Sequence, residues 1–123
     1  WPDGWQKGHC VCKESAGWLI MQELEAICFQ MISAVGMARS MYIEAIHLAK
    51  AGEFEQAQEM MQQAQQNFVE GHHAHAKLIE SEADGNQTPF SLILMHAEDQ
   101  MMSAEAFGIL AEEFIEIYKQ IKQ

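Results

Sequence analysis

Residues 90–102 read Phe-Ser-Leu-Ile-Leu-Met-His-Ala-Glu-Asp-Gln-Met-Met, and the organisation of the chain can be worked out from them. At about 100° per residue, a helix through this stretch collects on one face residues that are three and four positions apart. We call this face the Asp99 seam; its members are Leu92, Met95, Asp99, Met102, Ala106 and Ile109. A carboxylate on an apolar stripe is costly unless it is paired, protonated or bound to a metal. The position of Asp99 therefore needs an explanation.

The composition limits the class of protein. A chain of 123 residues is enough for one domain with a single core. A net charge of −11 argues against a nucleic-acid-binding surface, which would need a basic face, and suits a partner that carries basic residues. No uninterrupted apolar run reaches the roughly 18 residues of a membrane span. Three cysteines do not form a disulfide framework, so the cytoplasm is the expected location.

Residues 1–16 carry several helix breakers and show no helical periodicity, so we expect a loose or non-native leader before a domain at 17–123. His9, Cys10 and Cys12 could supply part of a metal site. A closed zinc site needs four ligands, however, and no second pair follows at a suitable spacing.

From Gly17 onward the pattern predicts three long amphipathic helices. The first ends at Lys50, with Gly52 at the position after the cap, and the second starts at once and ends at Gly85 and Asn86. Such a short connection makes these two helices antiparallel. Thr88 and Pro89 are expected to cap and start a third helix that runs to about Ile121.

The fold predicted from these elements is all-α, an antiparallel up-down three-helix bundle. The third helix has a second apolar stripe, which we expect to face the other two helices; its members are Phe107, Leu110, Phe114, Ile117 and Ile121. The Asp99 seam is then left over for another subunit, so the sequence argues for an oligomer.

Three kinds of chemistry remain open on the residues alone. His96 is followed by Asp99 and Gln100 one turn along, groups that can orient an imidazole that acts as a nucleophile. Glu44-x-x-His47 and Glu70-x-x-His73 match the Glu-x-x-His unit of di-iron bundles. The third possibility is a helical interaction adaptor, because residues 49–57 are similar to one turn of a tetratricopeptide hairpin. Cys28 lies in an apolar stripe and is expected to be a buried, inert thiol.

Several stretches together resemble one known family. Met95-His-Ala-Glu-Asp-Gln-Met-Met102, with the residues around it and with 110–118, resembles the lactose/cellobiose-type enzyme IIA of the bacterial phosphoenolpyruvate-dependent sugar phosphotransferase system. Residues 36–45 and 74–83 resemble the same family, in the right order and with the right gaps. The likeness covers about residues 19–121.

The resemblance implies a homotrimer of three-helix protomers, forming a nine-helix bundle. It implies that His96 accepts a phosphoryl group from the histidine-containing phosphocarrier protein and passes it to a cysteine of enzyme IIB, while the membrane enzyme IIC couples the transfer to sugar uptake. It also implies that three copies of Asp99 share a divalent cation, typically Mg²⁺, on the trimer axis. Such a cation would neutralise three like charges with the oxygen ligands it prefers.

The chain departs from the family pattern at two positions. The family usually reads His-Ala-Gln-Asp-His where this chain has His96-Ala-Glu-Asp-Gln100. Gln100 can donate a hydrogen bond to a phosphoryl oxygen but carries no positive charge, and Glu98 adds a negative group. His75 on the second helix is a candidate substitute donor. The sugar stays open among cellobiose-like β-glucosides, chitobiose and lactose.

Overall fold

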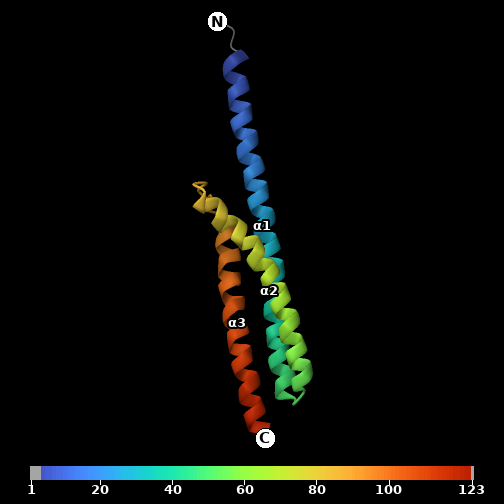
Figure 1. The fold of residues 1–123 in the computed structure, drawn as a ribbon. Helices are drawn as coiled ribbons and strands as arrows, with labels where there is room; N and C mark the ends of the chain where they lie inside the picture. The colour runs from blue at the N-terminus through green and yellow to red at the C-terminus, as the bar shows by residue number, and fades with distance from the viewer. Residues whose placement is uncertain (1–3, 123) are drawn as a thin grey trace.

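The computed structural model describes the backbone of residues 4–122 and the side chains of residues 21–122. It contains three helices, α1 (Gly4–Lys50), α2 (Phe54–Ala83) and α3 (Leu92–Lys122). The helices run up and down, so that α1 and α3 point the same way and α2 runs against both (Figure 1). No strand occurs within residues 4–122. The predicted all-α, up-down three-helix bundle is confirmed.

Helix α1 is longer than the sequence pattern indicated. It begins at Gly4 instead of near Gly17, and its first part projects beyond the other two helices (Figure 1). The glycines in this part cost about 1 kcal/mol each relative to alanine. Pro2 lies before the helix and the next proline is Pro89, so no proline interrupts the hydrogen bonds of α1. The side chains of His9, Cys10 and Cys12 lie outside the described residues. The division between a leader and a domain at 16/17 stays a prediction.

Both turns at the ends of α1 and α2 are Schellman motifs centred on glycine. After α1, Gly52 has a φ of 85°, and the N–H groups of Gly52 and Glu53 donate to the carbonyls of Ala49 and Leu48 at 3.0 and 2.9 Å. After α2, Gly85 has a φ of 92° and the same two bonds form. Only glycine adopts this backbone conformation without a steric penalty, so the two predicted helix ends are confirmed.

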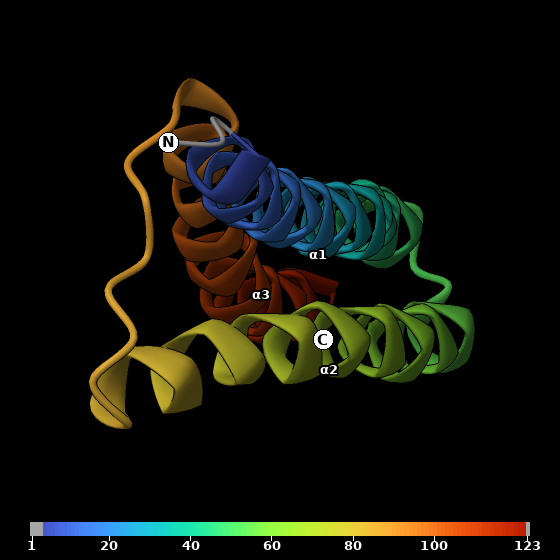
Figure 2. The ribbon, with the colours of Figure 1, turned by 90° about the horizontal axis from the view of Figure 1, so that it is seen from above.

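The start of α3 differs from the prediction. Residues 86–91 are not helical, and the connection crosses from α2 to α3 on the outside of the bundle (Figure 2). Ser91 is the N-cap: its Oγ accepts a hydrogen bond of 3.2 Å from the N–H of Leu94, and its carbonyl accepts the first helical bond, from Met95. The prediction that Thr88 caps the third helix and that Pro89 starts it is therefore wrong. Ser91 is an equally good capping residue and lies directly before the apolar run.

Helix α1 is the centre of the core. It supplies eight of the buried apolar residues, namely Leu24, Cys28, Met31, Val35, Ala38, Tyr42, Ala45 and Ala49. Its segment Met21–Lys50 is long and apolar enough to cross a membrane by length and composition alone, a test that core helices also pass. Glycines let its neighbours come close, because a Cβ at Gly71 would lie 2.5 Å from Val35 Cγ1 and one at Gly108 would lie 2.9 Å from Tyr42 Cζ.

Helix α3 turns a different face to the bundle from the one predicted. The residues that it buries are Ala97, Met101, Ala104, Ala111 and Ile115. The stripe from Phe107 to Ile121 is exposed instead, so its expected packing against α1 and α2 is wrong. Small side chains occupy the inner face because they let α3 approach α1 closely, and Gly108 makes room for the ring of Tyr42. Consequently α3 is apolar on both sides.

Candidate functional site

His96 lies in the second turn of α3 and is exposed to solvent. The next residue, Ala97, is fully buried against the core, and Met101 is buried one turn further on. These contacts fix the rotation of α3 about its own axis and thereby hold His96 on the outer surface. The imidazole makes no hydrogen bond to any side chain within residues 21–122. Its ring nitrogens are therefore accessible to a reaction partner.

The Asp99 seam faces away from the protomer along its whole length. Leu92, Met95, Met102 and Ile109 are 81%, 50%, 63% and 61% exposed, and Asp99 is exposed among them. This much apolar surface on a single face is typical of an interface with another molecule. The predicted role of the seam as a surface left over by the protomer fits the structure.

Asp99 and Gln100 lie one turn beyond His96, as predicted from their spacing. Gln100 is half-buried and Asp99 is exposed. Within the described side chains neither one is hydrogen-bonded to the imidazole. Their role in orienting the ring of His96 stays a prediction.

His75 does not meet His96 within one protomer. Its Nε2 lies 2.7 Å from Oε1 of Glu98, and this pair links α2 to α3. Residues two positions apart on a helix point about 160° away from each other, so Glu98 faces α2 while His96 faces outward. Sequence reasoning named both His75 and Glu98 but did not pair them. A signal was present, since each directly follows a small residue, Ala74 and Ala97, of the buried face.

The side chains described here do not assemble a metal site within one protomer. Across residues 21–122, no group of three or more His, Cys, Asp or Glu side chains lies close enough to share an ion. Glu44 and His47 form an exposed pair at 3.8 Å on the surface of α1. A single Asp99 offers only oxygen donors, which suit a hard cation, but several copies would have to converge to hold one.

Cys28 is the buried thiol that the sequence predicted. It is fully buried in α1, and burial raises the pKa of the thiol, with the nearby carboxylates Glu98 and Glu25 adding to the effect. A thiol that resists ionisation is a poor nucleophile. The predicted burial of Cys28 is therefore confirmed, and its inertness stays a prediction that the raised pKa supports.

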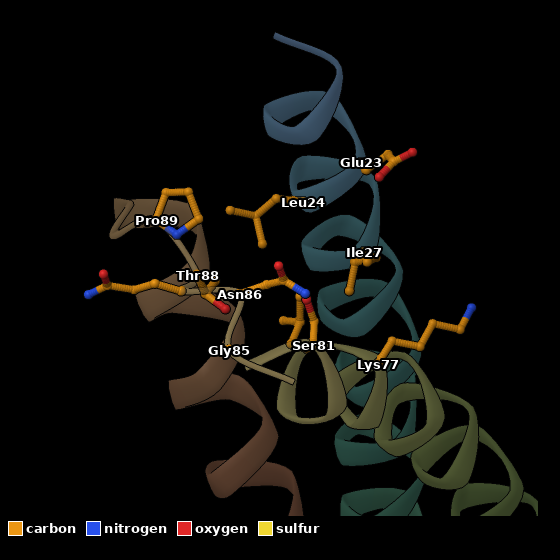
Figure 3. A pocket seen from close by; sticks show the side chains of 11 residues that line it. Glu23, Leu24, Ile27, Lys77, Ser81, Gly85, Asn86, Thr88 and Pro89 are labelled. Atoms are coloured by element: carbon orange, nitrogen blue, oxygen red, sulfur yellow. The ribbon is translucent and has the colours of Figure 1, made fainter. Parts of the chain in front are cut away.

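Among the described side chains of residues 21–122, two hollows stand out on the surface, and His96 lines neither. The larger, of about 600 Å³, lies beneath the connection from α2 to α3, where Leu24 extends from α1 toward the loop that carries Pro89 (Figure 3). The smaller, of about 210 Å³, lies between α2 and α3 over the ring of Tyr42, and we call it the Tyr42 crevice. Its other lining residues are Met61, Gln65, Phe68, Glu105, Gly108, Ile109 and Glu112.

Fold and site together define a class: a helical bundle that presents a histidine on its surface beside a long apolar seam. Such a protein has no enclosed cleft around the histidine and suits reactions with another macromolecule. The comparisons with known proteins agree with this description. The family model of the lactose/cellobiose-specific IIA subunit of the phosphotransferase system matches residues 26–119. The chain belongs to this family, and the predicted family is confirmed.

Characterised relatives cover most of the chain. The lichenan-specific phosphotransferase enzyme IIA component of Bacillus subtilis is 38% identical over 102 residues, which is 83% of this chain and 93% of the relative. The cellobiose-specific enzyme IIA of Bacillus anthracis superposes with a TM-score of 0.77 at 42% identity, covering 79% of this chain and 89% of that one. The chitobiose IIA of Escherichia coli, solved in complex with HPr, gives a TM-score of 0.71 at 34% identity, covering 81% and 97%. The chain is thus a IIA component of a sugar phosphotransferase system.

Proposed function

We propose that His96 is the phosphoryl acceptor of this IIA component. It takes the group from the histidine-containing phosphocarrier protein and passes it to the cysteine of an enzyme IIB. The observation that carries the proposal is the exposed, unbonded imidazole of His96 beside the largely apolar Asp99 seam. A similar protein has been solved in complex with HPr, which supports the phosphocarrier protein as the donor.

The transfer needs no further reactant. One ring nitrogen of His96 forms a P–N bond as the P–N bond to the donor histidine breaks, and each ring keeps a proton on its other nitrogen. The positive charge of the phosphorylated ring therefore moves with the phosphoryl group. In the second step a thiolate of enzyme IIB forms an S–P bond, and His96 returns to the neutral imidazole.

Gln100 and His75 have supporting roles in this proposal. The amide of Gln100 lies one turn from His96 and can donate a hydrogen bond to a phosphoryl oxygen. His75 acts through Glu98: the pair at 2.7 Å holds this carboxylate toward α2, on the side of α3 that is turned away from the phosphoryl group. His75 need not reach His96 to do this.

The working form in this proposal is a homotrimer, a nine-helix bundle with the three Asp99 seams along its axis. The exposed apolar members of the seam support this arrangement because they would be buried by it. Three Asp99 carboxylates at the axis would hold Mg²⁺ or another divalent cation, which neutralises their charge. The protein would work in the cytoplasm, on the uptake of a β-linked disaccharide of the cellobiose, chitobiose or lactose class.

Phosphorylation from phosphoenolpyruvate tests the proposal. The protein is incubated with ³²P-labelled phosphoenolpyruvate, enzyme I and the phosphocarrier protein. We expect a label that is labile in acid and stable in base, present in the wild type and absent from His96→Ala. His73→Ala is the matched control, because His73 is also an exposed helical histidine, and it should keep the label. A label that survives His96→Ala, or an unlabelled wild type, contradicts the proposal.

A further inference from the structure

The Tyr42 crevice contains polar groups that have no hydrogen-bond or ion-pair partner among the described side chains of the protomer. Tyr42 is only 4% exposed, yet its hydroxyl makes no hydrogen bond with any side chain of residues 21–122. The oxygen of this hydroxyl still reaches the surface, because no described side-chain oxygen or nitrogen is both fully buried and without a hydrogen-bond partner. It lies beside Gly108, which also lines the crevice. A nearly buried hydroxyl in such a position can bond to a donor or acceptor from outside the protomer.

The negative charge of the carboxylates around the crevice favours the binding of a cation. Glu105 and Glu112 line it, and neither carboxylate is paired with a described basic group. Burial, together with the charge of Glu112, raises the pKa of Tyr42, so the hydroxyl stays protonated and the local potential is negative. Gln65 adds an amide, and Phe68, whose ring stacks with that of His72, lines the crevice beside it. A side chain that is both planar and cationic fits these groups best.

The chain has one arginine, and it stands on the opposite flank of the bundle. Arg39 on α1 is half-exposed and has no ion pair with a described carboxylate. It lies about 160° around α1 from Met41, whose sulfur contacts Asn67 of α2. The Tyr42 crevice, by contrast, opens between α2 and α3. Arg39 therefore points away from the crevice of its own protomer.

The two features lie at the same level along the bundle. Tyr42 packs on Gly108, and α1 and α3 run in the same direction (Figure 1). Arg39 stands three residues before Tyr42, as Glu105 stands three residues before Gly108. A rotation about an axis along the Asp99 seam moves no residue along that axis. In the threefold ring of the proposed function, the inference requires that the α1 side of one protomer meet the α2 side of the next at this level.

We infer that Arg39 of each copy enters the Tyr42 crevice of the adjacent copy and bonds there to Tyr42, Glu105 and Glu112. The inference rests on the threefold assembly of the proposed function and names the polar contact that fixes its register. Gly36 agrees with it. Gly36 lies one turn before Arg39, and a Cβ there would meet nothing within 4 Å in the protomer, so packing inside the protomer does not require this glycine. A close approach of another copy would require a glycine at this position.

Charge exchange across the interface tests the inference. We measure by sedimentation the protein concentration at which half of the trimer has dissociated. Arg39→Glu and Glu112→Arg should each raise it at least tenfold, because each places like charges together in a partly desolvated site. The double variant Arg39→Glu/Glu112→Arg should recover most of the loss. Arg39→Gln, which removes the charge without adding a carboxylate, should weaken the trimer by a smaller factor.

Two control variants separate this contact from a general effect of charge. Lys50→Glu changes another exposed cation of α1, and Glu44→Arg changes an exposed carboxylate of α1, which does not line the crevice. Both should leave the midpoint within about twofold. A double variant no better than the single ones, an unchanged trimer in Arg39→Glu, or a monomeric wild type overturns the inference. Labelling of His96 is measured separately, so the proposed function can stand or fall by itself.

Discussion

Gly71→Ala should destabilise the protein, although alanine is the better helix former. The would-be Cβ lies 2.5 Å from Val35 Cγ1, whereas carbon atoms in contact sit about 3.5–4.0 Å apart. One of the two helices must therefore move by about 1 Å, because Val35 is almost fully buried and its β-branched side chain has one favoured rotamer in a helix. Overpacking costs about 1–3 kcal/mol, and the gain in helix propensity returns about 1 kcal/mol. The expected loss is about 1 kcal/mol.

The sign of this effect should reverse when Val35 is shortened. In a Val35→Ala background the obstructing methyl is gone, so Gly71→Ala should stabilise the protein by about 1 kcal/mol through helix propensity alone. The two substitutions are then coupled by about 2 kcal/mol. Urea unfolding followed by far-ultraviolet circular dichroism measures all four proteins at one fixed concentration, since association would shift the midpoints. Stabilisation by Gly71→Ala in the wild-type background would refute the packing argument.

Three further predictions test other parts of the structure. Asp99→Leu should keep or strengthen the trimer and make it indifferent to EDTA, because the buried charges are removed; a monomer in sedimentation would count against the axial placement. Ser91→Ala should cost about 1 kcal/mol in urea unfolding through the lost cap, while Thr88→Ala should cost almost nothing. Stability should also fall as the pH rises above about 9, because the raised pKa values of Cys28 and Tyr42 favour their neutral forms in the folded state, while the unfolded groups ionise near 9.0 and 10.0. Cys28→Ala should make this decline shallower, and an unchanged slope of stability against pH would contradict the assignment.

The helices and their ends could be predicted because glycine marks them. Gly52 and Gly85 adopt positive φ values that other residues avoid, so the positions of these glycines in the sequence predict the turns. The inner face of α3 could not be predicted in the same way. Ala97, Ala104 and Gly108 carry little hydrophobic signal, and a larger stripe from Phe107 onward hid them. Tight helix packing favours small residues, whereas hydrophobic periodicity gives more weight to large ones.

The candidate site was predictable in its position and not in its contacts. The 3–4 spacing around Asp99 predicted an outward seam, and Leu92 and Met102 are indeed exposed on it. The pairing of His75 with Glu98 depends on how α2 and α3 are rotated against each other, which no local pattern specifies. The Tyr42 crevice likewise exists only once Gly108 and Tyr42 meet across two helices.

A protomer without the partner copies proposed above would expose a conspicuous surface, because α3 is apolar on both sides. Its outer ribbon of leucine, methionine, phenylalanine and isoleucine runs from Leu92 to Ile121, nearly the full length of the helix. Chaperones and proteases recognise this kind of surface, so orphan copies would be cleared or would clump. In the proposed threefold assembly the cell would then be left with complete particles, and their number would follow the rate of synthesis steeply at low expression, since three newly made chains would have to find one another before any of them is protected.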